Sequence, residues 1–228
     1  MRSNKANLEV LFEDNHIVIV NKRAGDIVQG DKTGDKPLSD VVKEYIKEKY
    51  NKPGNVFLGV VHRLDRPTSG VIIFARTSKA LERTNKMLRD KTISKTYWAV
   101  VKNHPKKEKD TLVNYLKKNP KNNKSTVFAK ETDGSKKAIL HYKVLKKLEN
   151  YSLLEIDLET GRHHQIRAQL SSIGSVIKGD LKYGAARSNK DGSIHLHARK
   201  IAFIHPVNKE NISLTAPPPD EVIWNACI

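Results

Sequence analysis

The chain has 228 residues, enough for one substantial hydrophobic core or for two closely joined lobes. Its 42 Lys+Arg against 25 Asp+Glu give a net charge of +17 at pH 7 and a pI near 9.8, which favours RNA or DNA as a partner. A single cysteine, Cys227, excludes an intramolecular disulfide and a cysteine-based metal site. Without a membrane-length apolar run, an apolar leader or a basic amphipathic helix with aromatic anchors, the sequence predicts a cytoplasmic protein that binds no membrane.

The first half of the chain is predicted to alternate short apolar strands with two helices. β-Branched residues predict strands at 9–13 and 16–21, joined by a turn at 14–15. Apolar residues at helical spacing predict a helix from Pro37 to about residue 51, and a second helix that Ser78 caps and that runs to about residue 88. Further strands are expected at 56–61, 71–75 and 96–101, and the polar segment 62–70 connects the first two of these.

The second half is dominated by strands. Residues 102–124 are rich in lysine and are expected to form an exposed loop or a loose hairpin, with RNA contact left open. Paired strands are predicted at 138–148 and 151–158, then a helix at 164–173, a polar loop, a strand at 195–205 and a Pro-rich tail. Because there is no regular strand-helix repeat, we expect an α+β fold with a mixed, largely antiparallel sheet and flanking helices. A single catalytic domain over residues 1–228 is predicted, with two joined lobes as the alternative.

Two polar segments follow predicted strands and could carry chemistry. The first is His-Arg-Leu-Asp-Arg-Pro-Thr-Ser-Gly at 62–70, where Asp65 by itself is most simply a turn residue or the partner of an arginine. The second is Thr-Gly-Arg-His-His-Gln-Ile-Arg at 160–167, which by itself is a phosphate-binding helix start or surface charge.

The first segment resembles the HRLD-x-x-TSG signature of RluA-type pseudouridine synthases, and the second resembles the GR-x-HQIR motif of that family. Residues 95–100 resemble its K-x-Y-x-A-x-V strand, and residues 196–206 its LHA…F-x-HP segment. The resemblance covers nearly the whole chain, residues 11–217, and it is specific because four motifs occur in the expected order and spacing. It implies a pseudouridine synthase domain that isomerises uridines in ribosomal RNA, transfer RNA or both.

The sequence departs from this family at a few positions. Arg23 stands where K-P-A-G has proline, His163 stands where Thr or Ser is usual, and Ala168-Gln169 replaces Val-His. These differences bear on substrate fit more than on activity. The S4-type RNA-binding module that precedes some family members is not expected, since predicted strand residues begin by Val10.

The resemblance also implies the residues of the reaction. Asp65 is the expected catalytic carboxylate, acting as nucleophile or as base. Arg167 is expected to keep this carboxylate charged, since burial alone favours protonation. Tyr97 matches the tyrosine that stacks on the uracil. Because the isomerisation adds no group and changes no oxidation state, no cofactor is expected.

Further residues are expected to handle the RNA, because a paired uridine must be extruded before it can react. Arg63 is expected to enter the vacated stack or to grip a flanking phosphate, and Arg162 is assigned to RNA binding with it. His62 belongs to the same group and is interpreted as positioning the backbone. Ile166 and Leu196 are expected to line the pocket, although each could be an ordinary core residue. We expect a monomer that binds RNA.

One alternative is a metal enzyme, because the chain is rich in histidines, including His163, His164, His195, His197 and His205. It is disfavoured because neighbouring histidines diverge on a helix and no cysteine or closely placed carboxylate completes a site. The other alternative is a non-catalytic RNA-binding or ribosome-assembly protein. It is disfavoured because Asp65, Tyr97 and Arg167 are all present.

Overall fold

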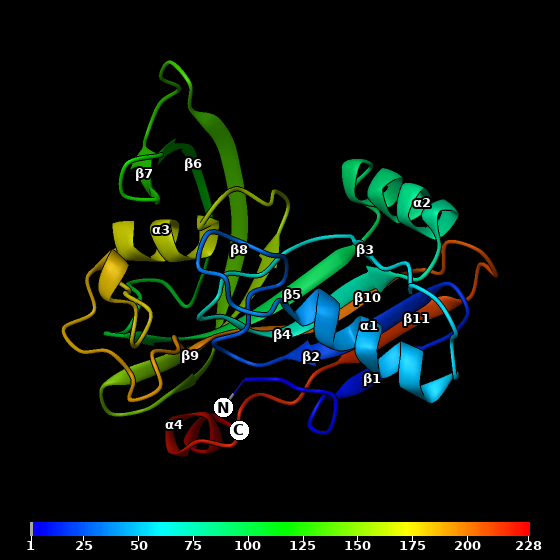
Figure 1. Ribbon diagram of the computed structural model, residues 1–228. Helices are drawn as coiled ribbons and strands as arrows, with labels where there is room; N and C mark the ends of the chain where they lie inside the picture. Colours follow the sequence, from blue (N-terminus) through cyan, green and yellow to red (C-terminus); the bar gives the residue numbers. More distant parts are fainter. Residues whose placement is uncertain (1) are drawn as a thin grey trace. The chain divides into compact units, whose positions relative to one another are not determined.

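The computed structural model describes residues 2–228 (Figure 1). The chain divides into two compact units. Unit 1 comprises Met1–Ser94 and Ala198–Pro219, and unit 2 comprises Lys95–His197 and Asp220–Ile228. Each unit has its own buried clusters of apolar side chains. The sequence analysis left a single domain or two joined lobes open, and the single domain stays a prediction.

Unit 1 contains a set of paired strands with helices on both faces. Its strands are β1 (Val10–Glu13), β2 (Ile17–Lys22), β3 (Gly59–Val60), β4 (Ser69–Ala75), most of β10 (Leu196–Ile204) and β11 (Asn211–Thr215). The central strands β2 and β4 pair from Ile17 opposite Ala75 to Lys22 opposite Gly70. Because side chains alternate between faces, Val18 and Val20 pack with α1 (Leu38–Lys49), whereas Ile17 and Ile19 pack with α2 (Ser78–Arg89). Burial on both faces explains why these strands are apolar without alternation.

Unit 2 contains five strands that pair antiparallel in a non-sequential order. Its strands are β5 (Ser94–Lys102), β6 (Lys109–Asn119), β7 (Lys124–Phe128), β8 (Lys136–Lys147) and β9 (Tyr151–Leu158), in the spatial order β5-β9-β8-β6-β7. The helix α3 (Gln165–Ser172) packs Ala168 against Leu116 and Ala138, and a short 3-10 helix (Leu181–Tyr183) follows it. The helix α4 (Val222–Cys227) buries Trp224 against Val100 and Leu153. The predicted α+β fold class is confirmed. Within residues 2–228 no helix is long and apolar enough to cross a membrane.

Most predicted elements are present, and three details were wrong. The strand expected at 56–61 is reduced to β3, because Val56 and Leu58 pack into the α1 cluster without pairing. The cap of α2 is Thr77, whose extended backbone lets its Oγ accept from the N–H of Ala80 at 3.1 Å. The sequence analysis missed β11 and α4 in the Pro-rich tail. For the lysine-rich stretch 102–124, the structure agrees with the hairpin alternative, because its ordered strand β6 forms a hairpin with β7.

Candidate active site

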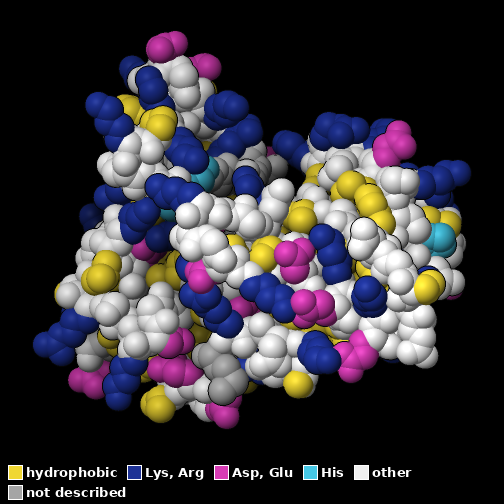
Figure 2. Space-filling view, viewed as in Figure 1, with side chains coloured by type: hydrophobic (Ala, Val, Ile, Leu, Met, Phe, Trp, Pro, Cys, Tyr) yellow, Lys and Arg dark blue, Asp and Glu magenta, His cyan; other side chains and the backbone are white. Residues whose placement is uncertain are grey.

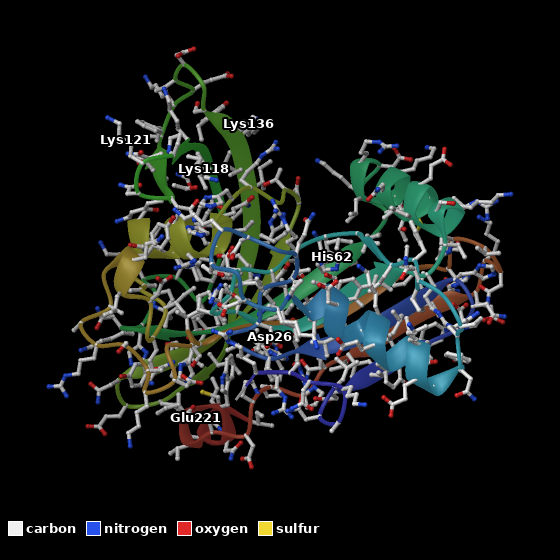
Figure 3. The ribbon with its side chains drawn as sticks, viewed as in Figure 1. Asp26, His62, Lys118, Lys121, Lys136 and Glu221 are labelled. Atoms are coloured by element: carbon white, nitrogen blue, oxygen red, sulfur yellow. The ribbon has the colours of Figure 1, made fainter. Side chains whose placement is uncertain are left out.

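In unit 1, Asp65 lies on the loop that connects β3 to β4. The N–H of Thr68 donates to the carbonyl of Asp65 at 3.0 Å, which closes a turn with Arg66 and Pro67 at its centre. Asp65 is partly buried, and Arg63 on the same loop is exposed. The Nε2 of His62 accepts from the N–H of Ile73 at 3.2 Å and ties the loop to β4 (Figure 3). This contact supports the interpretation of His62 as a backbone-positioning residue.

A buried lysine holds the same loop from the inside. Lys22, the last residue of β2, has only 1% of its surface exposed. Its Nζ donates to the carbonyl oxygens of Thr68 at 2.7 Å, Arg23 at 2.9 Å and Arg66 at 3.2 Å. Burial lowers the pKa of Lys22 to about 7, and the negative charges of Asp26 and Asp65 oppose this shift. The sequence analysis did not assign Lys22 to the site, although a lysine at the end of an apolar strand was a signal.

The glycine that ends the HRLD-x-x-TSG segment has a steric role in unit 1. Gly70 has a φ of +115°, a conformation that residues with a Cβ rarely adopt. A Cβ at this position would lie 2.4 Å from the carbonyl oxygen of Ala198 on β10. The close approach of two backbones therefore requires glycine at the start of β4.

In unit 2, Arg167 is buried on α3 and forms a bidentate ion pair with Asp180. The Nε lies 2.7 Å from Oδ2 and the Nη2 lies 2.8 Å from Oδ1. Both side chains are buried, with 6% and 1% exposed, and the guanidinium carbon lies 5.1 Å from the centre of the Tyr183 ring. A planar guanidinium held at two points has a fixed orientation. The sequence analysis missed Asp180, because a Gly-Asp pair in a polar loop reads as a simple turn.

The two histidines before α3 contradict one sequence-based argument. His163 and His164 were expected to diverge on a helix, but their rings stack with centroids 3.8 Å apart. The reason is that both precede the helix, and His164, the N-cap, has a left-handed backbone with φ of +52°. Across residues 2–228, no group of three His, Cys, Asp or Glu side chains is arranged to hold a metal ion.

The other predicted site residues of unit 2 lie on or near α3 and on two strands. Arg162 is exposed, and its Nε donates to the carbonyl of Lys137 at 2.9 Å. Tyr97 on β5, Ile166 on α3 and Leu196 on β10 are 7%, 5% and 4% exposed. Burial suits either a pocket wall or an ordinary core residue, so both interpretations of Ile166 and Leu196 stay open. Unit 1 therefore places His62, Arg63 and Asp65 on one loop, and unit 2 contains the remaining predicted residues.

Comparisons with known proteins agree with these motifs. The family model described as RNA pseudouridylate synthase matches residues 16–172. Ribosomal large subunit pseudouridine synthase D of Zymomonas mobilis is 32% identical over 226 residues, which cover 94% of this chain and 70% of that protein. The tRNA pseudouridine synthase C of Vibrio parahaemolyticus is 30% identical over 227 residues, which cover 92% of this chain and 89% of that protein.

A solved structure shows the same fold. The structure of Human RNA Pseudouridylate Synthase Domain Containing 4 superposes with a TM-score of 0.78 at 23% identity, covering 93% of this chain and 89% of that chain. The sequence-based prediction of a pseudouridine synthase is confirmed, and the non-catalytic alternative is not favoured. The chain belongs to the RluA-type family of RNA pseudouridine synthases, which are isomerases.

Proposed function

We propose that this protein converts specific uridines of ribosomal or transfer RNA to pseudouridine, with Asp65 as the catalytic carboxylate. The observation that carries the proposal is the construction of the Asp65 loop. Lys22 binds the carbonyls of Arg66 and Thr68 from the buried side, and His62 fixes the loop to β4. A carboxylate on a loop held at several points is preorganised for a step that needs a defined geometry. The relatives named for ribosomal and transfer RNA support the substrate class.

The proposed reaction requires a carboxylate beside the sugar and no cofactor. The bond from N1 to C1′ of uridine breaks, the uracil turns, and C5 bonds to C1′. N1 gains a hydrogen and C5 loses one, so the product is an isomer. Asp65 either attacks the sugar as a nucleophile or removes a proton as a base during glycosidic cleavage, and both roles stay open.

Residues of unit 2 are assigned to hold the reactants. Tyr97 provides an aromatic face on which the uracil stacks while it turns, with Ile166 and Leu196 as apolar walls. Arg167 keeps the catalytic carboxylate ionised, and its bidentate pair with Asp180 supports this role by orienting the guanidinium.

RNA contacts complete the proposal. Arg63 lies on the exposed side of the loop, two residues before Asp65, where it can contact RNA next to the extruded nucleotide. Arg162 binds RNA near α3. A cytoplasmic location and a monomeric state remain predictions.

The test combines RNA mapping with two carboxylate variants. Pseudouridines are mapped in cellular RNA from strains with and without this gene, and then after return of the wild type, Asp65→Asn or Asp90→Asn. Asp90 is the matched control, because it forms an exposed ion pair with Lys86 at the end of α2. We expect the wild type and Asp90→Asn to restore the missing pseudouridines and Asp65→Asn to restore none. Full restoration by Asp65→Asn would refute the assignment.

A further inference from the structure

Lysines gather on the β6–β7 hairpin and at the start of β8 in unit 2. We call six of them the hairpin lysines: Lys117, Lys118, Lys121, Lys124, Lys136 and Lys137. Figure 2 shows dark blue side chains over this region, and Figure 3 labels Lys118, Lys121 and Lys136. Five of the six are exposed, and Lys124 is partly buried. Their positive charge is therefore presented to solvent.

Many other lysines of this chain form ion pairs with acidic side chains, but the hairpin lysines do not within residues 2–228. By contrast, Lys5 and Lys36 each lie 2.6 Å from a glutamate oxygen, and Lys86 lies 2.5 Å from Asp90. Charge left uncompensated within the protein attracts an anionic partner.

The hairpin is fixed to the segment before α3 and to the 3-10 helix after it. The Oγ of Ser125 on β7 donates to the carbonyl of His163 at 2.7 Å, and the N–H of Ser125 donates to the Tyr183 hydroxyl at 2.8 Å. The Nζ of Lys182 donates to the carbonyls of Asn122 and Asn123 in the hairpin turn, at 3.3 and 3.2 Å. The lysines are thus held on a rigid arm beside α3.

Two of the lysines share the face of the sheet that α3 covers. Leu116 packs with Ala168 of α3, and Lys118 lies two residues further along β6, on the same face. Lys136 pairs directly with Leu116 across the strands and therefore also lies on this face. The helix α3 carries Arg167, so these two charges lie on the side of the sheet where RNA is proposed to bind.

We propose that the hairpin lysines bind backbone phosphates of the substrate RNA, away from the nucleotide that reacts. This inference rests on the proposed function and adds a second contact surface to it. A lysine ammonium acts as a compact point charge, so the contacts position RNA without reading its sequence. RNA is favoured over a membrane because the cluster forms part of an ordered antiparallel hairpin, and not an amphipathic helix with bulky apolar anchors. The surface contributes affinity and salt dependence, whereas the chemical step belongs to the Asp65 loop.

The test compares two triple variants with the same change in charge. The first is Lys118→Gln/Lys121→Gln/Lys136→Gln. The control is Lys47→Gln/Lys52→Gln/Lys79→Gln, in which three exposed lysines of unit 1 outside any ion pair within residues 2–228 are replaced. RNA extracted from cells without this gene is the probe, and its dissociation constant is measured at several salt concentrations. Melting temperatures verify that both variants fold, and pseudouridine formation at saturating RNA is measured separately.

We expect the hairpin variant to bind RNA about tenfold to a hundredfold more weakly at physiological salt, with a salt slope shallower by about 2 to 3. Its activity at saturating RNA should match that of the wild type, and the control should lose much less affinity. The proposal would be overturned if both variants lost RNA affinity equally, or if the hairpin variant kept its RNA affinity. It would also be overturned if these lysines supported binding to anionic lipid vesicles but not to RNA. A wild type that binds RNA through these lysines but forms no pseudouridine would refute the proposed function and leave this surface standing.

Discussion

Replacing Lys22 by methionine separates the positioning of the Asp65 loop from the chemistry of Asp65. Methionine has a similar length and no charge, so it fills the buried space without donating a hydrogen bond. The carbonyl oxygens of Arg23, Arg66 and Thr68 then lose their common donor. We expect the loop to shift, while the side chains of Asp65 and Arg63 on it stay chemically unchanged.

The magnitude follows from two opposing terms. A hydrogen bond to a charged group contributes about 1.5 to 3 kcal/mol, so three such bonds are a substantial gross loss. The fall of the Lys22 pKa from 10.5 to about 7 corresponds to about 5 kcal/mol of net cost for keeping Lys22 charged in the folded protein, a cost that methionine removes. We therefore expect Lys22→Met to change the unfolding free energy at pH 7 by only a few kcal/mol, and the catalytic rate to fall about a hundredfold because of the misplaced loop.

The lowered pKa also gives the pH dependence a definite sign. Between pH 7 and 10.5 the unfolded chain keeps the Lys22 proton that the folded protein has released, so this group makes stability rise with pH. From pH 7 to 9 the rise is about 2 kcal/mol in the wild type and is absent from Lys22→Met. Below pH 7 Lys22 becomes protonated in both the folded and the unfolded protein, so its contribution to stability no longer changes with pH.

The unfolding free energy is measured by urea unfolding at pH 7 and pH 9, and the catalytic rate by single-turnover kinetics at saturating RNA. Lys47→Met, which replaces an exposed lysine, is the control and should match the wild type in stability and in rate. If the unfolding free energy changes equally between pH 7 and pH 9 in the wild type and in Lys22→Met, burial does not lower the pKa of Lys22. Full single-turnover activity of Lys22→Met would show that Lys22 does not position the Asp65 loop.

Three other predictions concern unit 2 and the charge of the chain. Tyr97→Phe should keep RNA affinity, whereas Tyr97→Leu should lose about 1 to 3 kcal/mol of stacking; equal activity in all three forms would remove Tyr97 from the site. Asp180→Asn should lower the unfolding free energy by about 3 to 5 kcal/mol, since it breaks the buried, bidentate ion pair between Arg167 and Asp180; a change below about 1 kcal/mol in urea unfolding would contradict this. The logarithm of RNA affinity should fall by about 0.7 to 0.9 per phosphate contact for each log unit of salt, and affinity that does not respond to salt would disprove the electrostatic attraction.

Local sequence determined much of the secondary structure and the family. The continuous apolar runs of β2 and β4 and the helical spacing in α1 depend on near neighbours, so their periodicity could be read directly. The motifs around Asp65 and Arg167 are contiguous, so their resemblance to the family, which implies their chemistry, could be recognised before the fold was known. Element boundaries were less certain, since Val56 and Leu58 are apolar but pack without pairing.

The tertiary structure decided the contacts that hold these motifs. Lys22 binds the carbonyl of Thr68 across 46 residues, Ser125 binds His163 across 38, and Arg167 binds Asp180 across 13. No periodicity encodes such pairings, because they depend on how separate elements pack. The sequence by itself therefore determined the reaction class and the residues predicted to carry it. Only the packed structure determined that a buried lysine positions the Asp65 loop and that the lysine-rich stretch is an ordered hairpin fixed beside α3.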